Sequence, residues 1–85
     1  MGRELIEWSE HARAQIRLRN LSEKQIVEVL VKPTFVLRQN SIRFRAIRKL
    51  REHGKSYLLV VVYERIKTGY RIITAFKTSK VEKYQ

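Results

Sequence analysis

The sequence contains no cysteine and no aspartate, and it has a single proline among its 85 residues. Without cysteine the chain has no disulfide framework, no thiolate zinc site and no cysteine nucleophile. Two-metal nuclease sites are built from clustered carboxylates, and the glutamates after Glu28 stand apart from one another. Metal-dependent hydrolysis is therefore the least supported chemistry, and we expect neither a metal ion nor another cofactor.

The chain also lacks a long apolar run. Its N-terminal segment "MGRELIEWSEHAR" carries a charge every few residues, so it fits neither a signal peptide nor a membrane span. We expect a cytoplasmic protein that does not bind membranes. With 44% hydrophobic and 32% charged residues, the chain is predicted to form one domain over residues 1–85 with a thin core.

Positive charge is what the sequence has in excess. Nineteen Lys and Arg residues against eight Glu residues give a formal net charge of +11. A charge of this size attracts polyanions such as nucleic acid or an acidic protein, and it also serves solubility alone. Composition leaves these alternatives open.

The first half of the chain predicts helices. Ser9 is a suitable N-cap for a helix that ends near Arg19, with Glu10 favourably placed in its first turn. On the helical wheel His11 shares a broad arc with small and apolar residues, so we expect it to face inward or toward a rim. The preceding segment "RELIEW", residues 3–8, is either a strand or a packed arm, and the pattern does not decide between them.

A second helix has a stronger signal. Ser22 and Gln25 have the spacing of a capping box, and Pro33 stops the helix near Val31. The two helices are predicted to form an αα-hairpin. The segment "SKVEKY", residues 79–84, repeats the capping-box spacing and predicts one further helical turn.

The second half of the sequence alternates with a period of two. Strands are predicted at "TFVLRQ", "SIRFRAIRKL", "YLLVVVYE" and "YRIITAFK", and the third is apolar on both faces, as a central strand is. Alternation places Arg43, Arg45 and Lys49 on one face of their strand, and Arg71 with Lys77 on one face of the last strand. The predicted fold is α+β, with two N-terminal helices packed on an antiparallel sheet of about four strands.

The order of these segments resembles a family of small uncharacterised domains. "HARAQIRLRNLSEKQIVEVLVKP" is similar to the opening of that family, and "SIRFRAI", "YLLVVVY" and "YRIITAFKTSKVEKY" follow in the same order. The family in turn resembles the RelE/ParE-like toxins and their BrnT-like relatives. The resemblance implies a RelE/ParE-like fold, cleavage of RNA without metal, free or on the ribosome, and inhibition by an acidic antitoxin-like protein. The chain has no complete set of the catalytic residues known from RelE.

Metal-free RNA cleavage needs a base for the 2′-OH, an acid for the leaving oxygen, and cations around the phosphorus. His11 is the candidate base or acid because its ordinary pKa lies near neutrality, although such a histidine is commonly half-buried and bonded to backbone. Arg71 is the candidate for stabilising the transition state. Tyr84, near the end of the chain, is a candidate proton donor, while most strand tyrosines serve packing.

Arg43, Arg45 and Lys77 are the candidate nucleic-acid-binding residues. They form one cluster with Arg71 if the two strand faces coincide, and a slip of one residue separates them. Two alternatives remain open beside the ribonuclease toxin. The chain is then either a non-catalytic basic module that binds an acidic protein or nucleic acid, or a stable domain whose charge serves solubility.

Overall fold

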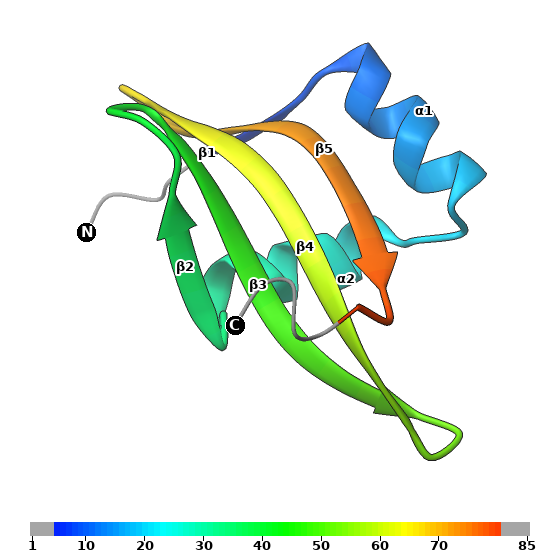
Figure 1. The fold of residues 1–85 in the computed structure, drawn as a ribbon. Helices are drawn as coiled ribbons and strands as arrows, with labels where there is room; N and C mark the ends of the chain where they lie inside the picture. The colour runs from blue at the N-terminus through cyan, green and yellow to red at the C-terminus, as the bar shows by residue number, and fades with distance from the viewer. Residues whose placement is uncertain (1–4, 81–85) are drawn as a thin grey trace.

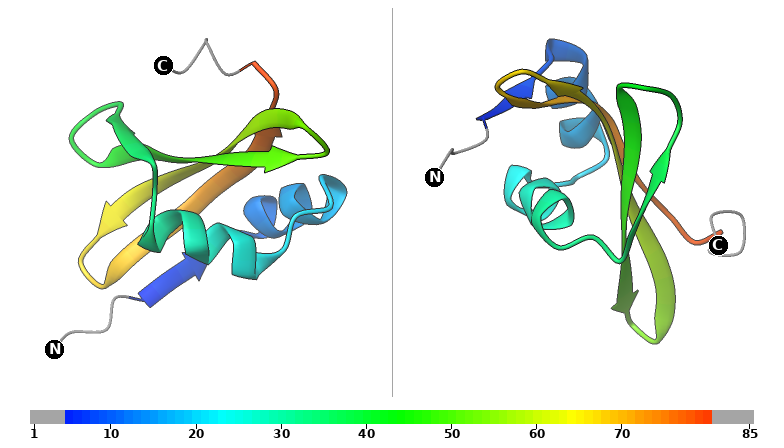
Figure 2. Two further views of the ribbon diagram at one scale, coloured as in Figure 1. Left: turned by 90° about the horizontal axis from the view of Figure 1, so that it is seen from below. Right: turned by 90° about the vertical axis from the view of Figure 1, so that its left-hand side faces the viewer.

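The computed structural model describes residues 5–80, which form a sheet with two helices on one of its faces (Figure 1, Figure 2). The elements are β1 (Leu5–Trp8), α1 (Glu10–Leu18), α2 (Glu23–Val31), β2 (Phe35–Arg38), β3 (Arg43–Glu52), β4 (Lys55–Ile66) and β5 (Gly69–Thr78). The strands lie in the order β1-β5-β4-β3-β2. The helical turn predicted at "SKVEKY" falls mostly outside the described residues.

The predicted fold class was wrong in its sheet. The sequence predicted about four antiparallel strands of RelE/ParE-like arrangement, whereas the sheet has five strands and is mixed, because β1 pairs with β5 in parallel. The undecided segment "RELIEW" thus contributes a strand that precedes both helices. Its four residues are too few for a clear alternation. Its partner, Gly69–Ile72, lies far along the chain, so no local sequence pattern predicts this strand pairing.

Gly69 makes the parallel pair possible. It is buried with φ of +148°, and a Cβ atom at this position would collide with the backbone oxygen of Leu5 and lie 2.6 Å from its nitrogen. The Leu5 N–H donates to the Thr68 carbonyl at 2.8 Å, so the two backbones approach closely at this point. Only glycine combines this backbone conformation with the space that β1 needs.

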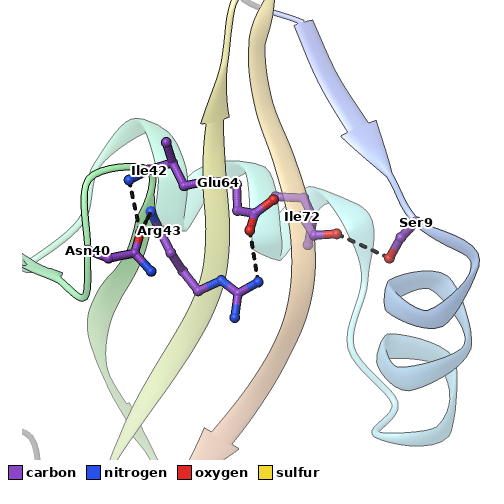
Figure 3. Close-up of polar contacts among 6 residues, drawn as sticks. All are labelled: Ser9, Asn40, Ile42, Arg43, Glu64 and Ile72. Carbon is purple, nitrogen blue, oxygen red and sulfur yellow. Dashed lines mark hydrogen bonds and ion pairs between the residues drawn. The ribbon is translucent and has the colours of Figure 1, made fainter.

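Both helices begin as the capping signals predict. The Ser9 hydroxyl accepts a hydrogen bond from the Ala12 N–H at 2.9 Å and donates to the Ile72 carbonyl at 3.2 Å, which ties the start of α1 to β5 (Figure 3). Ser22 and Gln25 form the predicted capping box of α2. The caps therefore fix where each helix begins and, in α1, also where it sits on the sheet.

The two faces of the sheet carry separate apolar cores. On the helix-covered face, the buried residues come from both helices and from β3, β4 and β5: Ala12, Ile16, Ile26, Val29, Ala46, Leu59, Val61, Tyr63, Ile72 and Ala75. On the other face, called the second face below, the core consists of Ile47, Leu58, Val60 and Val62, with Phe35, Ile73 and Phe76 packed against it. β4 contributes to both cores, which confirms its predicted central position.

A β-bulge interrupts the pairing of β4 with β5. Val62 pairs with Thr74, but the next residue, Tyr63, pairs with Ile72, so Ile73 is an extra residue on β5. A bulge of this kind changes the alternation of side chains along the strand that contains it. Residues of β5 before and after Ile73 therefore follow different face patterns.

Candidate nucleic-acid interface

Four cations share one face of β3. Arg43, Arg45, Lys49 and Arg51, which we call the β3 stripe, occupy alternate positions with Ile47, whose side chain lies in the core of the second face. The pairing of β3 with β4 continues without a shift from end to end, so the alternation holds throughout. Residues two apart on a strand are about 6.8 Å apart, which gives the stripe a length of roughly 27 Å.

One end of the second face is crossed by a row of alternating charges. The register places Arg43 of β3 beside Glu64 of β4, Glu64 beside Arg71 of β5, and Arg71 beside Glu7 of β1. Arg43 Nη2 lies 2.8 Å from Glu64 Oε2 (Figure 3), and Arg71 Nη2 lies 3.5 Å from Glu7 Oε1. Each arginine of this charge row therefore faces a carboxylate, which cancels most of its field at a distance.

The start of the β3 stripe is held in place by the preceding turn. The Asn40 side-chain oxygen accepts hydrogen bonds from the backbone N–H groups of Ile42, at 2.9 Å, and Arg43, at 2.8 Å (Figure 3). With its amide oxygen turned toward Arg45, Gln39 accepts from that guanidinium at 2.7 and 2.9 Å. Asparagine is favoured in turns for this local bonding, and here Asn40 fixes the start of the stripe at Arg43 while Gln39 holds the Arg45 side chain.

The other end of the stripe is not neutralised. Lys49 and Arg51 are exposed, and within residues 5–80 neither forms an ion pair. The neighbouring Glu52 points to the opposite face, where it accepts a hydrogen bond from Lys77 Nζ at 2.8 Å. That hydrogen bond and the charge of Lys77 lower the pKa of Glu52 below its ordinary value. Glu52, the described carboxylate next to Arg51 in the sequence, is thus already engaged.

The last residue of the stripe, Arg51, lies on a two-stranded ribbon, and Lys49 lies just before it. The β2 pairing stops at Ile47 and the β5 pairing stops at Leu58, so β3 and β4 continue alone over residues 50–57 (Figure 1). His53 and Gly54 form its turn, with φ values of 51° and 76°. Two consecutive positive φ values are typical of the tight turns that match the twist of a hairpin. The ribbon carries uncompensated charge away from the body of the sheet.

The predicted face of Lys77 was wrong, and the bulge is the reason. Arg71 precedes the extra residue Ile73 and lies on the second face, whereas Lys77 follows it and pairs with Leu59 of the helix-covered core. Its ammonium group lies 5.1 Å from the Tyr57 ring centroid and bonds Glu52. The predicted cluster of Arg43, Arg45, Arg71 and Lys77 therefore keeps its three arginines and loses its lysine.

The predicted catalytic residues are not brought together. His11 is exposed on the first turn of α1, whose buried residues Ala12 and Ile16 pack on the helix-covered face. Arg71 lies on the second face and its described ionic partner is Glu7. His11 was expected to face inward or toward a rim, and the inward alternative was wrong, because the buried side of α1 is the one that carries Ala12 and Ile16. Tyr84 lies outside the described residues.

Sequence reasoning undervalued Lys49 and Arg51. Lys49 was placed on the correct strand face, but neither residue was named as a candidate for nucleic-acid binding. The signal was present in their spacing, because positions 43, 45, 49 and 51 are all an even number of residues apart. What the spacing does not show is which cations face a carboxylate on the next strand.

Other classes of site find little support in residues 5–80. No three histidine or carboxylate side chains in this range gather closely enough to hold a metal ion. None of the described helices is long and apolar enough to cross a membrane.

Comparison with known families places the chain in one of them. A family model described as a domain of unknown function, DUF4258, matches residues 8–77, so the chain belongs to this family. No curated protein and no solved structure gives a significant match. The family description names no activity, substrate or partner, and nothing in it links the chain to the RelE/ParE-like toxins. The resemblance to those toxins therefore stays a prediction.

Proposed function

We propose that this chain is a non-catalytic module that binds the phosphate backbone of single-stranded RNA along the β3 stripe. The observation that carries the proposal is the uncompensated end of the stripe. Lys49 and Arg51 are exposed, face no carboxylate among the described residues, and lie in line with Arg43 and Arg45. A net charge of +11 adds long-range attraction to this local arrangement.

The physical basis of binding is the replacement of counterions. A basic side chain that contacts a phosphate releases the condensed cation it replaces, so affinity falls as salt rises. An arginine additionally offers a planar fork of N–H donors to the phosphate oxygens, whereas a lysine acts as a point charge. A row of cations along an extended strand suits an extended polyanion, because phosphates spaced along the ligand can then meet side chains spaced along the strand.

The geometry favours binding over cleavage. A metal-independent ribonuclease needs its base and its phosphate-stabilising cation around one scissile bond. His11 lies on the helix side of the sheet and Arg71 on the second face, with no described contact between them. The carboxylate beside the stripe, Glu64, is held in an ion pair with Arg43, and no described histidine bonds a stripe residue.

RNA is proposed as the ligand because of the resemblance to RNA-directed toxins. Phosphate contacts alone do not distinguish RNA from DNA, since the distinguishing group is the 2′-OH. A single-stranded DNA of the same base sequence is therefore the comparison ligand. Tighter binding of the RNA supports this part of the proposal, and equal binding limits the module to single-stranded nucleic acid in general.

The test is the affinity of a fluorescently labelled single-stranded RNA, measured by anisotropy in EDTA over a range of salt concentrations. The variant with Lys49→Glu and Arg51→Glu should bind roughly tenfold more weakly or worse, because two phosphate contacts become repulsive. The slope of log K against log salt should become shallower by about 0.7 for each lost contact. The matched control is Lys24→Glu with Lys67→Glu, which makes the same change of net charge at two exposed sites outside the stripe.

Two results would contradict the proposal. An equal loss of affinity in the stripe variant and in the control would show that only the diffuse charge matters. RNA fragments with 2′,3′-cyclic phosphate ends, formed in EDTA with or without ribosomes and lost in Arg71→Ala, would identify a ribonuclease instead.

A further inference from the structure

Exposed apolar side chains gather around β2. Of the six large apolar side chains that are exposed in the described part of the chain, four lie on β2 or on the segments that flank it. Val36 and Leu37 of β2 are 44% and 39% exposed, Val31 at the end of α2 is 67% exposed, and Ile42 before β3 is 49% exposed. Val36 pairs with Ala46 of the helix-covered core and Leu37 with Arg45 of the β3 stripe, so exposed apolar side chains lie on both faces at this edge, where another molecule can cover them.

β2 is also an edge strand. It is the last strand in the sheet order and pairs with β3 alone among the described strands. Alternate residues of such a strand direct their N–H and C=O groups away from the sheet, where they can pair with an added strand. The sequence of β2, "FVLR", has no lysine, proline or bulge of the kind that discourages such pairing.

The edge is held in a fixed conformation at both ends. At its start, the Thr34 N–H donates to the Ile47 carbonyl at 2.7 Å, and the Thr34 hydroxyl accepts from the Lys49 N–H at 2.9 Å. At its end, Asn40 bonds two backbone N–H groups of the turn that leads into β3. An edge that is already extended loses little conformational entropy when another strand joins it.

The charges near this edge are mainly positive. Arg38 lies on β2 itself, and Arg48 donates to the Lys32 carbonyl at 3.4 Å across the cleft between α2 and β3. Glu28 is the one acid among the described residues that line this cleft, which has a volume of about 380 Å³. A second copy of the chain would bring another net charge of +11 against this surface. An acidic occupant is favoured instead, because it brings the complementary charge.

We propose that β2 docks an extended, acidic segment of a partner protein, which adds a sixth strand to the sheet. Backbone hydrogen bonds supply affinity, apolar side chains of the segment pack on Leu37 on the second face, and its carboxylates meet Arg38, Lys32 and Arg48 on the helix-covered face, where Val36 also lies. The proposal is independent of RNA binding, because the edge of β2 and the uncompensated end of the β3 stripe use different side chains.

The test uses a capped peptide that alternates glutamate and valine, with a second peptide of the same composition in separate blocks as control. Backbone amide shifts of the isotope-labelled protein are followed by NMR near physiological salt, where charges beyond about 8 Å are screened. The alternating peptide should shift the amides of Phe35–Arg38 most strongly and slow their hydrogen exchange. The block peptide, which lacks the period of a strand, should bind roughly tenfold more weakly, because its apolar and acidic side chains fall on the wrong faces.

A pair of variants sharpens the test. Val36→Glu should weaken the alternating peptide roughly tenfold or more, because it places a like charge beside the incoming strand. Leu18→Glu makes the same change at an 81% exposed apolar site on α1 and should leave the affinity within about twofold. If either variant folds poorly, the amide shifts that the two peptides cause in the unaltered protein still test the proposal.

Three outcomes would overturn the proposal. Equal affinity for the two peptides, or amide shifts centred on Lys49 and Arg51, would reduce the effect to attraction between opposite charges. Dimerisation of the unaltered protein in sedimentation experiments, abolished by Val36→Glu, would assign the edge to a second copy. The variant with Lys49→Glu and Arg51→Glu should lose RNA and keep the peptide, so failure of the stripe and failure of the edge are separate results.

Discussion

The two ends of the second face contain similar numbers of cations and differ in what faces them. At the charge row, Arg43 and Arg71 lie beside Glu64 and Glu7 on neighbouring strands. At the hairpin end, Lys49 and Arg51 lie beside Leu58 and Ser56. The comparison teaches that the number of basic residues on a strand does not define a polyanion site. What decides is whether the register places a carboxylate opposite each one.

The same difference separates structural from binding roles. Opposite charges across neighbouring strands each stabilise a sheet by about 0.2–1 kcal/mol, so the charge row helps hold four strands in register. Cations without such partners repel one another and contribute nothing comparable to the fold. Their charge is available to a ligand, which is why the proposed interface is centred on the hairpin end.

The largest expected effect on the charge row comes from Gly69→Ala, which displaces Glu7 by displacing the backbone of β1. The new methyl group would collide with Leu5, so β1 must leave its place and Glu7 must leave Arg71. We expect a loss of about 2–4 kcal/mol in the free energy of unfolding, because both the positive φ and the close approach oppose alanine. Urea denaturation of the two proteins measures this difference in the free energy of unfolding.

The matched control is Gly54→Ala. Gly54 has φ of +76°, but no atom lies within 4 Å of the position of its Cβ. Gly54→Ala should lower the free energy of unfolding by only about 1 kcal/mol, because only the backbone conformation opposes alanine there. Equal losses in the two variants would show that the approach of β1 to Gly69 does not matter.

A second prediction concerns a variant in which Arg43 of the charge row loses its carboxylate and so resembles the cations of the hairpin end. Glu64→Gln removes the carboxylate from beside Arg43, in a pair whose side chains are 41% and 18% exposed. Stability should fall by about 1–2 kcal/mol, since a half-buried guanidinium loses its partner. RNA affinity should rise severalfold, because the β3 stripe then gains one uncompensated cation.

Anisotropy and urea denaturation on the same sample check both halves of this prediction. Glu23→Gln is the control, because it breaks an exposed ion pair with Arg13 on the helix side of the molecule. An identical gain of affinity in both variants would mean that net charge, and not the register of β3 and β4, controls binding.

The smallest expected effect concerns Glu52 and its dependence on pH. Lys77 lowers the pKa of Glu52 in the folded state, so the folded protein binds a proton there less readily than the unfolded chain. The resulting stabilisation is fully present above the unfolded value of about 4.3 and is lost as the pH falls through the lowered folded value. Because both side chains are exposed, the effect on the melting temperature should be small.

Melting curves of the unaltered protein and of Glu52→Gln test the pH prediction. The difference between them should be greatest near neutral pH and should vanish in acid. A difference that persists unchanged at low pH would show that the ion pair with Lys77 is not its cause.

Local signals in the sequence predict local structure well here. Ser9 and Ser22 mark the starts of both helices, Pro33 follows the end of α2, and the apolar run of β4 marks the centre of the sheet. The placement of Arg43 and Arg45 on one face also follows from alternation alone. Each of these predictions depends on residues a few positions apart, where chain geometry is almost fully determined.

What the sequence does not disclose depends on residues that are distant along the chain. The parallel pairing of β1 requires the approach of Leu5 to Gly69, and the extra residue Ile73 moves Lys77 to the other face. No local pattern distinguishes a glycine that permits such an approach from a glycine in a turn. The pairing of Arg43 with Glu64 likewise depends on the register of two strands, which alternation leaves undetermined.

The parallel pair has a consequence for the order in which the protein folds. Leu5 and Gly69 are 64 positions apart, so among the strands of residues 5–80 the first to leave the ribosome pairs with the last to be made. The hairpins of β3, β4 and β5 close short loops and can assemble among themselves, while β1 must wait until β5 exists. Until then, β1 has no β5 to pair with, so its backbone N–H and C=O groups are open to other strands, and synthesis itself sets how long that exposure lasts.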